Sequence, residues 1–307
     1  MRTADRANLY RGVVAVEGLV SAEQAVLDGE RAAERSGVVV RSLTTKDEFD
    51  GARFVWDEVW PTAPGGTEIT AHLMRALHHA GGYVGGAYVD GTMVGACLAF
   101  VGRSQDPDGQ WHPHLHSHVA GTLPGYGDRG IGTALKLHQR GWALERDFDR
   151  IEWTFDPLVR RNARLNLMKL GGVAVDYLVD FYGEMADDVN AGDPSDRFIL
   201  RWDIASDRVA SALSGGVAAD SRDELVALGA EVVLHANPDG EPLVLPSSAP
   251  VRLVAVPADV VAIRRSDPLL ASRWRLALRE ALEPVVSRGG RVVAQTVEGD
   301  YVVEVPS

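Results

Sequence analysis

The most constraining feature of the sequence is a glycine-rich turn between an extended segment and a helix. Residues 123–135 read Leu-Pro-Gly-Tyr-Gly-Asp-Arg-Gly-Ile-Gly-Thr-Ala-Leu. The strand expected over 116–123 ends there, and a helix follows with Ile131, Leu135 and His138 on one face. Such a turn leaves backbone N–H groups unpaired at the positive end of the helix dipole, which is a site for phosphate. A plain strand-to-helix connection is the alternative, because glycine also serves tight turns with positive φ.

The composition is that of an acidic globular protein. The 307 residues, of which 46% are hydrophobic, suffice for one large domain or two ordinary ones. The net charge of −12 argues against nucleic acid or an anionic membrane as a partner. The segment from Met1 to Tyr10 lacks the apolar core of a signal peptide, and no apolar run is long enough to cross a bilayer. With Cys97 as the only cysteine, we expect a cytoplasmic protein without a disulfide.

The turn resembles the acyl-CoA pyrophosphate loop of the GNAT (N-acetyltransferase) superfamily. The family pattern is Arg/Gln-x-x-Gly-x-Gly/Ala, and this chain has Gly130-x-Gly132 with Gly127 where Arg or Gln is usual. That departure removes one side-chain contact and leaves the backbone cradle. The resemblance covers roughly residues 38–205. It implies an α/β (α+β) fold with a mixed, mostly antiparallel sheet flanked by helices.

The order of expected elements fits that family. Strands are expected over 38–43, 83–89, 93–101, 116–123, 150–155, 173–182 and 197–202, and helices over 21–36, 46–60, 68–79 and 162–170. The loop 103–111 should be exposed. We therefore expect an N-terminal helical extension over 1–37, a GNAT-like acyl-CoA-binding domain over 38–205, and a smaller C-terminal α+β unit over 206–307 that serves in docking, as a lid or in dimerisation.

The C-terminal unit has its own pattern. Residues 206–250 are less regular, with short strands at 231–234 and 243–245, and a further strand is expected over 251–256. A helix opens at Asp267-Pro268, and Pro284 should kink or end it. Its apolar face is expected to pack chiefly on the hairpin 291–305; that face comprises Leu270, Trp274, Leu278 and Leu282.

The resemblance also implies where the cofactor binds. In the family, the strand before the loop splays from its neighbour, and its freed backbone groups hold the pantetheine arm and stabilise the oxyanion. The cofactor-binding residues expected here are Gly121, Thr122 and Leu123 on that strand, Arg129, Gly130, Ile131, Gly132 and Thr133 at the phosphate loop, and Asn162 and Asn166 near the pantetheine amides.

The general base has several candidates. Four histidines alternate from 112 to 118, so an extended strand places them on one face. His116 and His118 lie nearest the expected splay, and histidine has a suitable intrinsic pKa. Glu152, on the strand 150–155, is the other candidate. The alternatives are surface or hydrogen-bonded histidines at the start of a strand, and a solvated or structurally paired glutamate. The spacing of roughly 7 Å lets two histidines at most share a metal ion without bending, and no metal is expected.

The general acid is harder to assign. Family members carry a tyrosine on the helix after the strand 150–155, and this chain has Leu167 at that position. An asparagine expected earlier on the same helix is replaced by Arg160. Tyr182 is the candidate acid, unless the thiolate leaves unprotonated.

Several local matches are similar to one GNAT branch, some of whose members are linked to N-succinylation of amino acids. They include His116-Ser-His118, Leu135-Lys136, Asn162-Ala163 and Tyr182-Gly183. This resemblance implies acetyl-CoA or another acyl-CoA, such as succinyl-CoA, as co-substrate and a small-molecule amine, such as an amino acid, as acceptor. A non-catalytic acyl-CoA sensor on the same fold is the alternative, and a homodimer stays open.

Overall fold

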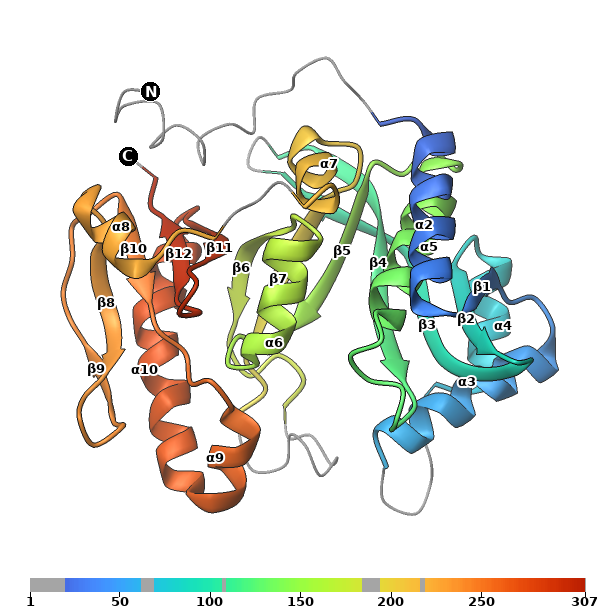
Figure 1. The fold of residues 1–307 in the computed structure, drawn as a ribbon. Helices are drawn as coiled ribbons and strands as arrows, with labels where there is room; N and C mark the ends of the chain where they lie inside the picture. The colour runs from blue at the N-terminus through green and yellow to red at the C-terminus, as the bar shows by residue number, and fades with distance from the viewer. Residues whose placement is uncertain (1–19, 62–68, 107–108, 184–193, 216–218, 307) are drawn as a thin grey trace.

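The computed structural model describes residues 20–61, 69–106, 109–183, 194–215 and 219–306. Its main feature is one twelve-stranded sheet with the order β1-β2-β3-β4-β5-β7-β6-β11-β12-β10-β8-β9 (Figure 1). The strands are β1 (Val39–Ser42), β2 (Tyr83–Val89), β3 (Thr92–Gln105), β4 (Trp111–Thr122), β5 (Arg150–Phe155), β6 (Val173–Leu178), β7 (Arg197–Asp203), β8 (Glu231–Ala236), β9 (Pro242–Val244), β10 (Val251–Val254), β11 (Arg291–Gln295) and β12 (Tyr301–Glu304).

Nearly all neighbouring strands are antiparallel; β4 with β5 and β8 with β10 are parallel. The helices are α2 (Ala22–Ser36), α3 (Lys46–Val59), α4 (Ala71–His79), α5 (Ile131–Leu144), α6 (Arg160–Ala163) with the π-helix η1 (Arg164–Lys169), α7 (Asp207–Leu213), α8 (Arg222–Ala227), α9 (Val260–Ser266) and α10 (Pro268–Val286). The expected mixed, mostly antiparallel sheet flanked by helices is confirmed.

Helices cover both faces of the first part of the sheet. On one face, α3 and α4 pack on β2 and β3 around Phe49, Trp56 and Met74, which are fully or almost fully buried. On the other face, α5 packs on β2, β3 and β4, and α2 lies outside it (Figure 1). The amphipathic helices each turn an apolar stripe to the sheet, which leaves the strand ends free to build a site.

The helix α2 begins and ends where the sequence predicts. The Gln24 amide donates to the Ser21 hydroxyl at the N-cap, and Gly37 ends the helix with φ of +64°. It lies close against α5, because a Cβ on Gly29 would come within 3.2 Å of the His138 backbone.

The C-terminal strands continue the same sheet. Strand β11 pairs with the β6 edge at Val292 and Ala174. Helix α10 lies across this second part of the sheet (Figure 1). The expectation that α10 packs chiefly on the hairpin 291–305 was wrong, because it contacts β6, β8 and β9 as well as β10 and β11. Pro284 lies inside α10, which continues to Val286.

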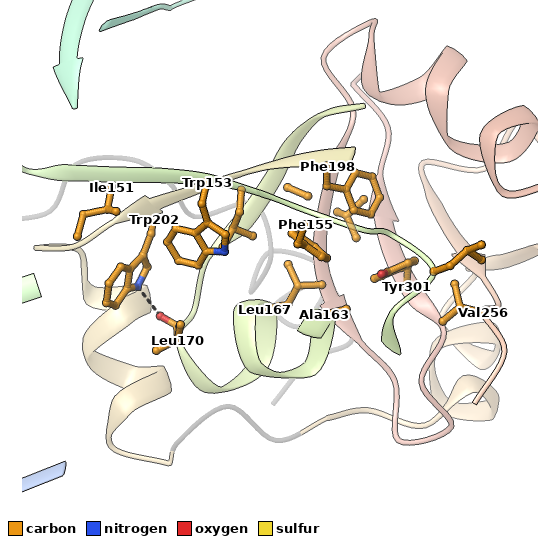
Figure 2. Close-up of a cluster of buried hydrophobic side chains, with 14 of the residues drawn as sticks. Ile151, Trp153, Phe155, Ala163, Leu167, Leu170, Phe198, Trp202, Val256 and Tyr301 are labelled. Atoms are coloured by element: carbon orange, nitrogen blue, oxygen red, sulfur yellow. Dashed lines mark hydrogen bonds between the residues drawn. The ribbon is translucent and has the colours of Figure 1, made fainter. Parts of the chain in front are cut away.

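Buried aromatic rings join the two parts of the sheet (Figure 2). The rings of Phe198 on β7 and Tyr301 on β12 meet edge to face with centroids 5.5 Å apart. The Tyr301 hydroxyl donates to the carbonyl of Pro157 at 2.6 Å, and Trp202 Nε1 donates to the carbonyl of Leu170 at 2.7 Å. One apolar cluster therefore runs from the first part of the sheet into the second.

Several boundaries differ from the sequence-based expectation. Strand β3 continues to Gln105 and β4 begins at Trp111, so residues 103–105 and 111 of the loop expected over 103–111 are strand; residues 107–108 lie outside the described residues. Strand β6 ends at Leu178 rather than 182. The region 206–250 contains α7 and α8, which the sequence analysis did not predict.

Candidate active site

The glycine-rich turn forms an open cradle at the start of α5. Gly130 is the N-cap residue with φ of +83°, and no side chain caps the helix. A Cβ built on Gly125, Gly127 or Gly132 would meet no atom within 4 Å among the described residues. The first-turn amides of α5, which have no intrahelical acceptor, therefore face accessible space. An uncapped helix start of this kind suits an anionic group.

Strand β4 leaves β5 immediately before this cradle. The parallel pairing of β4 with β5 has two positions, Leu115 with Ile151 and His116 with Glu152. Beyond them β4 stays paired with β3 as far as Thr122, while β5 pairs with β7 on its other side. A gap therefore opens between residues 117–122 of β4 and residues 153–155 of β5.

The backbone groups of β4 divide between β3 and this gap. The Leu123 amide donates to the carbonyl of Val94 at 2.8 Å, so this amide points towards β3 and not into the gap. In an antiparallel ladder alternate residues point their backbone groups the other way. Ala120 and Thr122 thus face the gap, whereas Gly121 and Leu123 face β3. Among the three strand residues expected to bind the pantetheine arm, only Thr122 directs its N–H and C=O there.

Glu152 lies in a buried charged cluster on β5. Its side chain accepts from the Ser104 hydroxyl at 3.1 Å and lies 3.4 Å from Arg201 Nε and 3.7 Å from His114 Nε2. Asp106 joins the same cluster through Arg201 at 3.3 Å. Glu152 is 6% exposed, so these partners hold it at one position beside the point where β4 and β5 separate.

The histidines of β4 form a ladder on the Glu152 face. The ring centroids of His114 and His116 lie 6.2 Å apart, as do those of His116 and His118. Phe100 contacts both of the latter rings. Burial, and then the neighbouring His118 and His114, lower the pKa of His116 to about 4. The His114 pKa is also lowered, chiefly by burial, against the opposing effect of Glu152.

A β-bulge accounts for the exposure of His118. Ala99 pairs with Ser117 and Leu98 with Val119, so His118 is the extra residue of β4. The bulge shifts the alternation of the strand at this point. Glu152, His116 and His118 thus gather on one face beside the gap.

The remaining expected residues lie on the far side of the gap. The hydroxyls of Tyr182 and Thr154 lie 2.9 Å apart, and Tyr182 is 42% exposed. Asn162 is half-buried on α6 and Asn166 is buried on η1. Leu167 is fully buried in the apolar cluster (Figure 2), so the family's tyrosine position holds no acid here.

The sequence analysis missed Lys136 on α5. Its Nζ donates to the Ser117 hydroxyl at 2.8 Å and lies 3.8 Å from the centroid of the Trp153 ring. Burial lowers the pKa of Lys136 to about 7. A signal was present in the sequence: the chain has three lysines, at 46, 136 and 169, and this one lies within an apolar helical pattern.

The role of Asp156, which directly follows β5, was not predicted from the sequence. Its carboxylate accepts two hydrogen bonds from Arg275 on α10, at 2.8 and 2.9 Å, and one from Arg264 on α9 at 2.8 Å. Burial alone would raise the Asp156 pKa, but the two guanidinium groups hold it well below its usual range. This carboxylate ties β5 to the C-terminal helices.

Within the described ranges, no group of three or more His, Cys, Asp or Glu side chains is arranged to hold a metal ion. Among the helices formed by those residues, none combines the length and apolarity needed to span a membrane.

The fold and the site together define a class of protein. Its sheet is mixed, and its two central parallel strands separate immediately in front of a helix whose first turn has no side-chain cap. The profile of the acetyltransferase (GNAT) family matches residues 45–171. Over this segment the protein is similar to the GNAT family, whose members are acetyltransferases. No curated protein matches the sequence significantly.

The similarity of this chain to solved structures is distant. The ribosomal-protein-S18-alanine N-acetyltransferase from Escherichia coli is 14% identical, with 55% of this chain and 95% of that chain covered and a TM-score of 0.41. A GNAT acetyltransferase from Elizabethkingia anophelis with acetyl-CoA bound is 13% identical, with 54% and 98% covered and a TM-score of 0.41. An aminoglycoside acetyltransferase from an uncultured soil metagenomic sample is 16% identical, with 41% and 82% covered and a TM-score of 0.36.

Proposed function

We propose that this protein transfers an acyl group from acyl-CoA directly to the amine of a small molecule. The observation that carries the proposal is the gap between β4 and β5, which runs into the uncapped start of α5. The pyrophosphate binds the first-turn amides of α5 at residues 129–133. The pantetheine arm lies along Ala120 and Thr122 in the gap, with Asn162 and Asn166 on its other side.

The acceptor amine approaches from the face of Glu152, His116 and His118. Glu152 is the preferred base, because it is held beside the last paired position of β4 and β5. His116, with its pKa lowered to about 4, is neutral near pH 7 but a weak base. Alignment of amine and thioester in the gap supplies a large part of the rate enhancement.

The acyl group is acetyl or succinyl, and the acceptor is an amino acid or a related small amine. The branch linked to N-succinylation supports the succinyl donor through its local sequence matches. The single buried cysteine, Cys97, supports a cytoplasmic location, where acyl-CoA is also present. We keep the division into segments 1–37, 38–205 and 206–307 as a proposal, with the last segment docked on the second.

The test is a transfer assay with acetyl-CoA and succinyl-CoA against a panel of amino acids and small amines. Thiol release reports turnover, and mass spectrometry identifies the N-acyl product. We expect release that depends on both donor and amine. A protein that binds neither acetyl-CoA nor succinyl-CoA would overturn the proposal.

A sensor that binds acyl-CoA without turnover is the second candidate. The observation that favours it is Leu167, which is buried and apolar where a proton donor is expected. Tight binding of acyl-CoA, measured by calorimetry, with no thiol release across the amine panel would support it.

A further inference from the structure

We propose that Lys136 is the catalytic acid that protonates the departing thiolate of CoA. The inference rests on the N-acyltransferase function proposed above. It assigns the proton donor to α5, on the face of the sheet opposite to Glu152 and His116.

The geometry places the Lys136 ammonium where the two strands part. Its Nζ contacts Ser117 on β4, at 2.8 Å from the hydroxyl, and Trp153 on β5, at 3.8 Å from the ring centroid. These are the first residues of each strand after the last paired positions, His116 and Glu152. The ammonium therefore bridges the closed end of the gap.

The dimensions of the gap bring the sulfur to this point. Because His118 is the extra residue of the bulge, the span from Thr122, beside the phosphate cradle, back to Ser117 matches four residues of β3, from Gly95 to Ala99, or about 14 Å. The pantetheine arm, which contains two amides, has about the length of an extended peptide of four to five residues, or ~16 Å. A pyrophosphate bound at the start of α5 therefore leaves the thioester beside Ser117 and Lys136.

The surroundings of Lys136 contain no fixed counter-charge. The side chain is 7% exposed, and none of the ion pairs formed within the described part of the chain includes it. The titratable groups that interact with it electrostatically are Cys97 on β3, whose thiol pKa is raised to about 11 by burial, and His116 on the other face of β4. A buried ammonium without a carboxylate favours an anion that forms beside it.

Burial also makes this ammonium a better acid than an ordinary lysine. With its pKa lowered to about 7, Lys136 exchanges a proton near neutral pH, which is the range in which general acids are effective. Tyr182, the other candidate acid, lies with Thr154 on the Glu152 side of β5 and is exposed.

The amine nitrogen bonds to the thioester carbon as the π pair of the C=O bond moves to oxygen, and the amine proton passes to the base on the Glu152 face. The C=O bond then re-forms as the C–S bond breaks, the electron pair of the C–S bond stays on sulfur, and Lys136 Nζ gives its proton to that sulfur. The products are the N-acyl amine and CoA thiol; the protonated base releases its proton to water, and neutral Lys136 takes one up from water.

A direct test uses the small number of lysines. Protein labelled with [13C]lysine should give three Cε signals, and those of the exposed Lys46 and Lys169 serve as internal controls. Lys136→Met assigns the third. We expect the Lys136 signal to titrate near pH 7 in the free protein. CoA should raise that pKa, whereas desulfo-CoA, which lacks the sulfur, should leave it unchanged. An identical response to the two ligands would overturn the placement of the sulfur.

The kinetic test separates acid catalysis from binding. We expect Lys136→Met to lower kcat roughly 10²-fold, the range for loss of a general acid, with the Kd for CoA within threefold of wild type. The fall of kcat above about pH 7 should disappear. Lys136→Arg should retain the charge but not the transfer, and Tyr182→Phe should behave as wild type.

The outcomes distinguish the two proposals. Normal kcat and an unchanged alkaline limb in Lys136→Met would overturn the acid assignment alone, as would a 10²-fold loss in Tyr182→Phe with Lys136→Met unaffected. A wild-type protein that binds acyl-CoA but releases no thiol with any amine would overturn the transferase function and the acid step together.

Discussion

Replacing Asp156 by asparagine should destabilise the whole protein. The substitution keeps the shape of the side chain and removes its charge, so Arg275, which is 1% exposed, and Arg264 lose their common carboxylate. Breaking a buried ion pair by removing one partner costs about 3–5 kcal/mol. A domain has a free energy of unfolding of roughly 5–15 kcal/mol, so the loss is a large fraction of the total.

The measurement is urea denaturation followed by tryptophan fluorescence and far-UV circular dichroism. We expect the two signals to change together at a lower midpoint in Asp156→Asn. Glu241→Gln is the matched control, because the pair of Glu241 with Arg273 is exposed and its removal should leave the midpoint unchanged. The double variant Asp156→Leu/Arg275→Met should recover part of the stability, since it removes both charges of the more deeply buried pair and leaves only the Arg264 charge.

The dependence on pH has a definite sign. The Asp156 pKa is lower in the folded protein than the value of about 3.9 for an unfolded chain. Its stabilisation is therefore present above about pH 4 and is lost as the pH falls further towards the folded pKa. A cost below about 1 kcal/mol, or a C-terminal third that unfolds separately while residues 38–205 stay folded, would refute the reasoning.

Further predictions concern the cofactor site, the base and the C-terminal helix. Gly132→Asp places charge and bulk in open space at the cradle, so CoA affinity should fall at least tenfold, or about 1.4 kcal/mol, in calorimetry, while Gly132→Ala should bind nearly as wild type. Glu152→Gln should lower kcat roughly 10²-fold with CoA binding retained, and a normal kcat would move the base to His116 or His118, to be tested by their alanine variants. Trp274→Ala should cost about 3–5 kcal/mol in thermal or urea unfolding, because the ring is 3% exposed; a cost under 1 kcal/mol would contradict its core role.

The choice of Gly132 follows from the structure rather than the sequence. From the sequence alone, Gly130 would be the glycine to substitute, because the sequence pattern places it at the start of the helix. In the structure Gly130 has φ of +83°, and a Cβ there would meet the Ser36 hydroxyl at 2.8 Å. A Gly130 variant would therefore strain the fold as well as block the anion.

The first seven strands were predictable because local signals agree along that part of the chain. The alternation in β5, the turn at Asp90-Gly91 and the Ser21 cap each act within a few residues of sequence. The same holds for the phosphate loop, since a helix start is a local structure. The alternation of β5 predicts that Glu152 and Thr154 share a face, but it does not say which face of the sheet that is.

The rest depends on contacts that a local pattern does not encode. The direction of each backbone amide on β4 is set by the register with β3. The sequence alone therefore does not show that the backbone groups of Thr122 face the gap while those of Leu123 face β3. In the sequence, Lys136 is only a polar residue within an apolar helical pattern. Its contacts with Ser117 and Trp153 are visible only in the folded structure. Asp156 and Arg275 are 119 residues apart, and no spacing rule joins them.

The pairing of β11 with β6 has a consequence for synthesis on the ribosome. When residue 205 has emerged, β6 is still an open edge and Asp156 has no arginine partner, because both α10 and β11 lie in the last third of the chain. At about 5–20 residues per second, the remaining chain takes roughly 5–20 s to appear. An unpaired strand edge recruits other chains during such a delay. A ribosome that stalls in this interval leaves a nascent chain prone to aggregate, and a chaperone that shields β6 would raise the yield of folded protein.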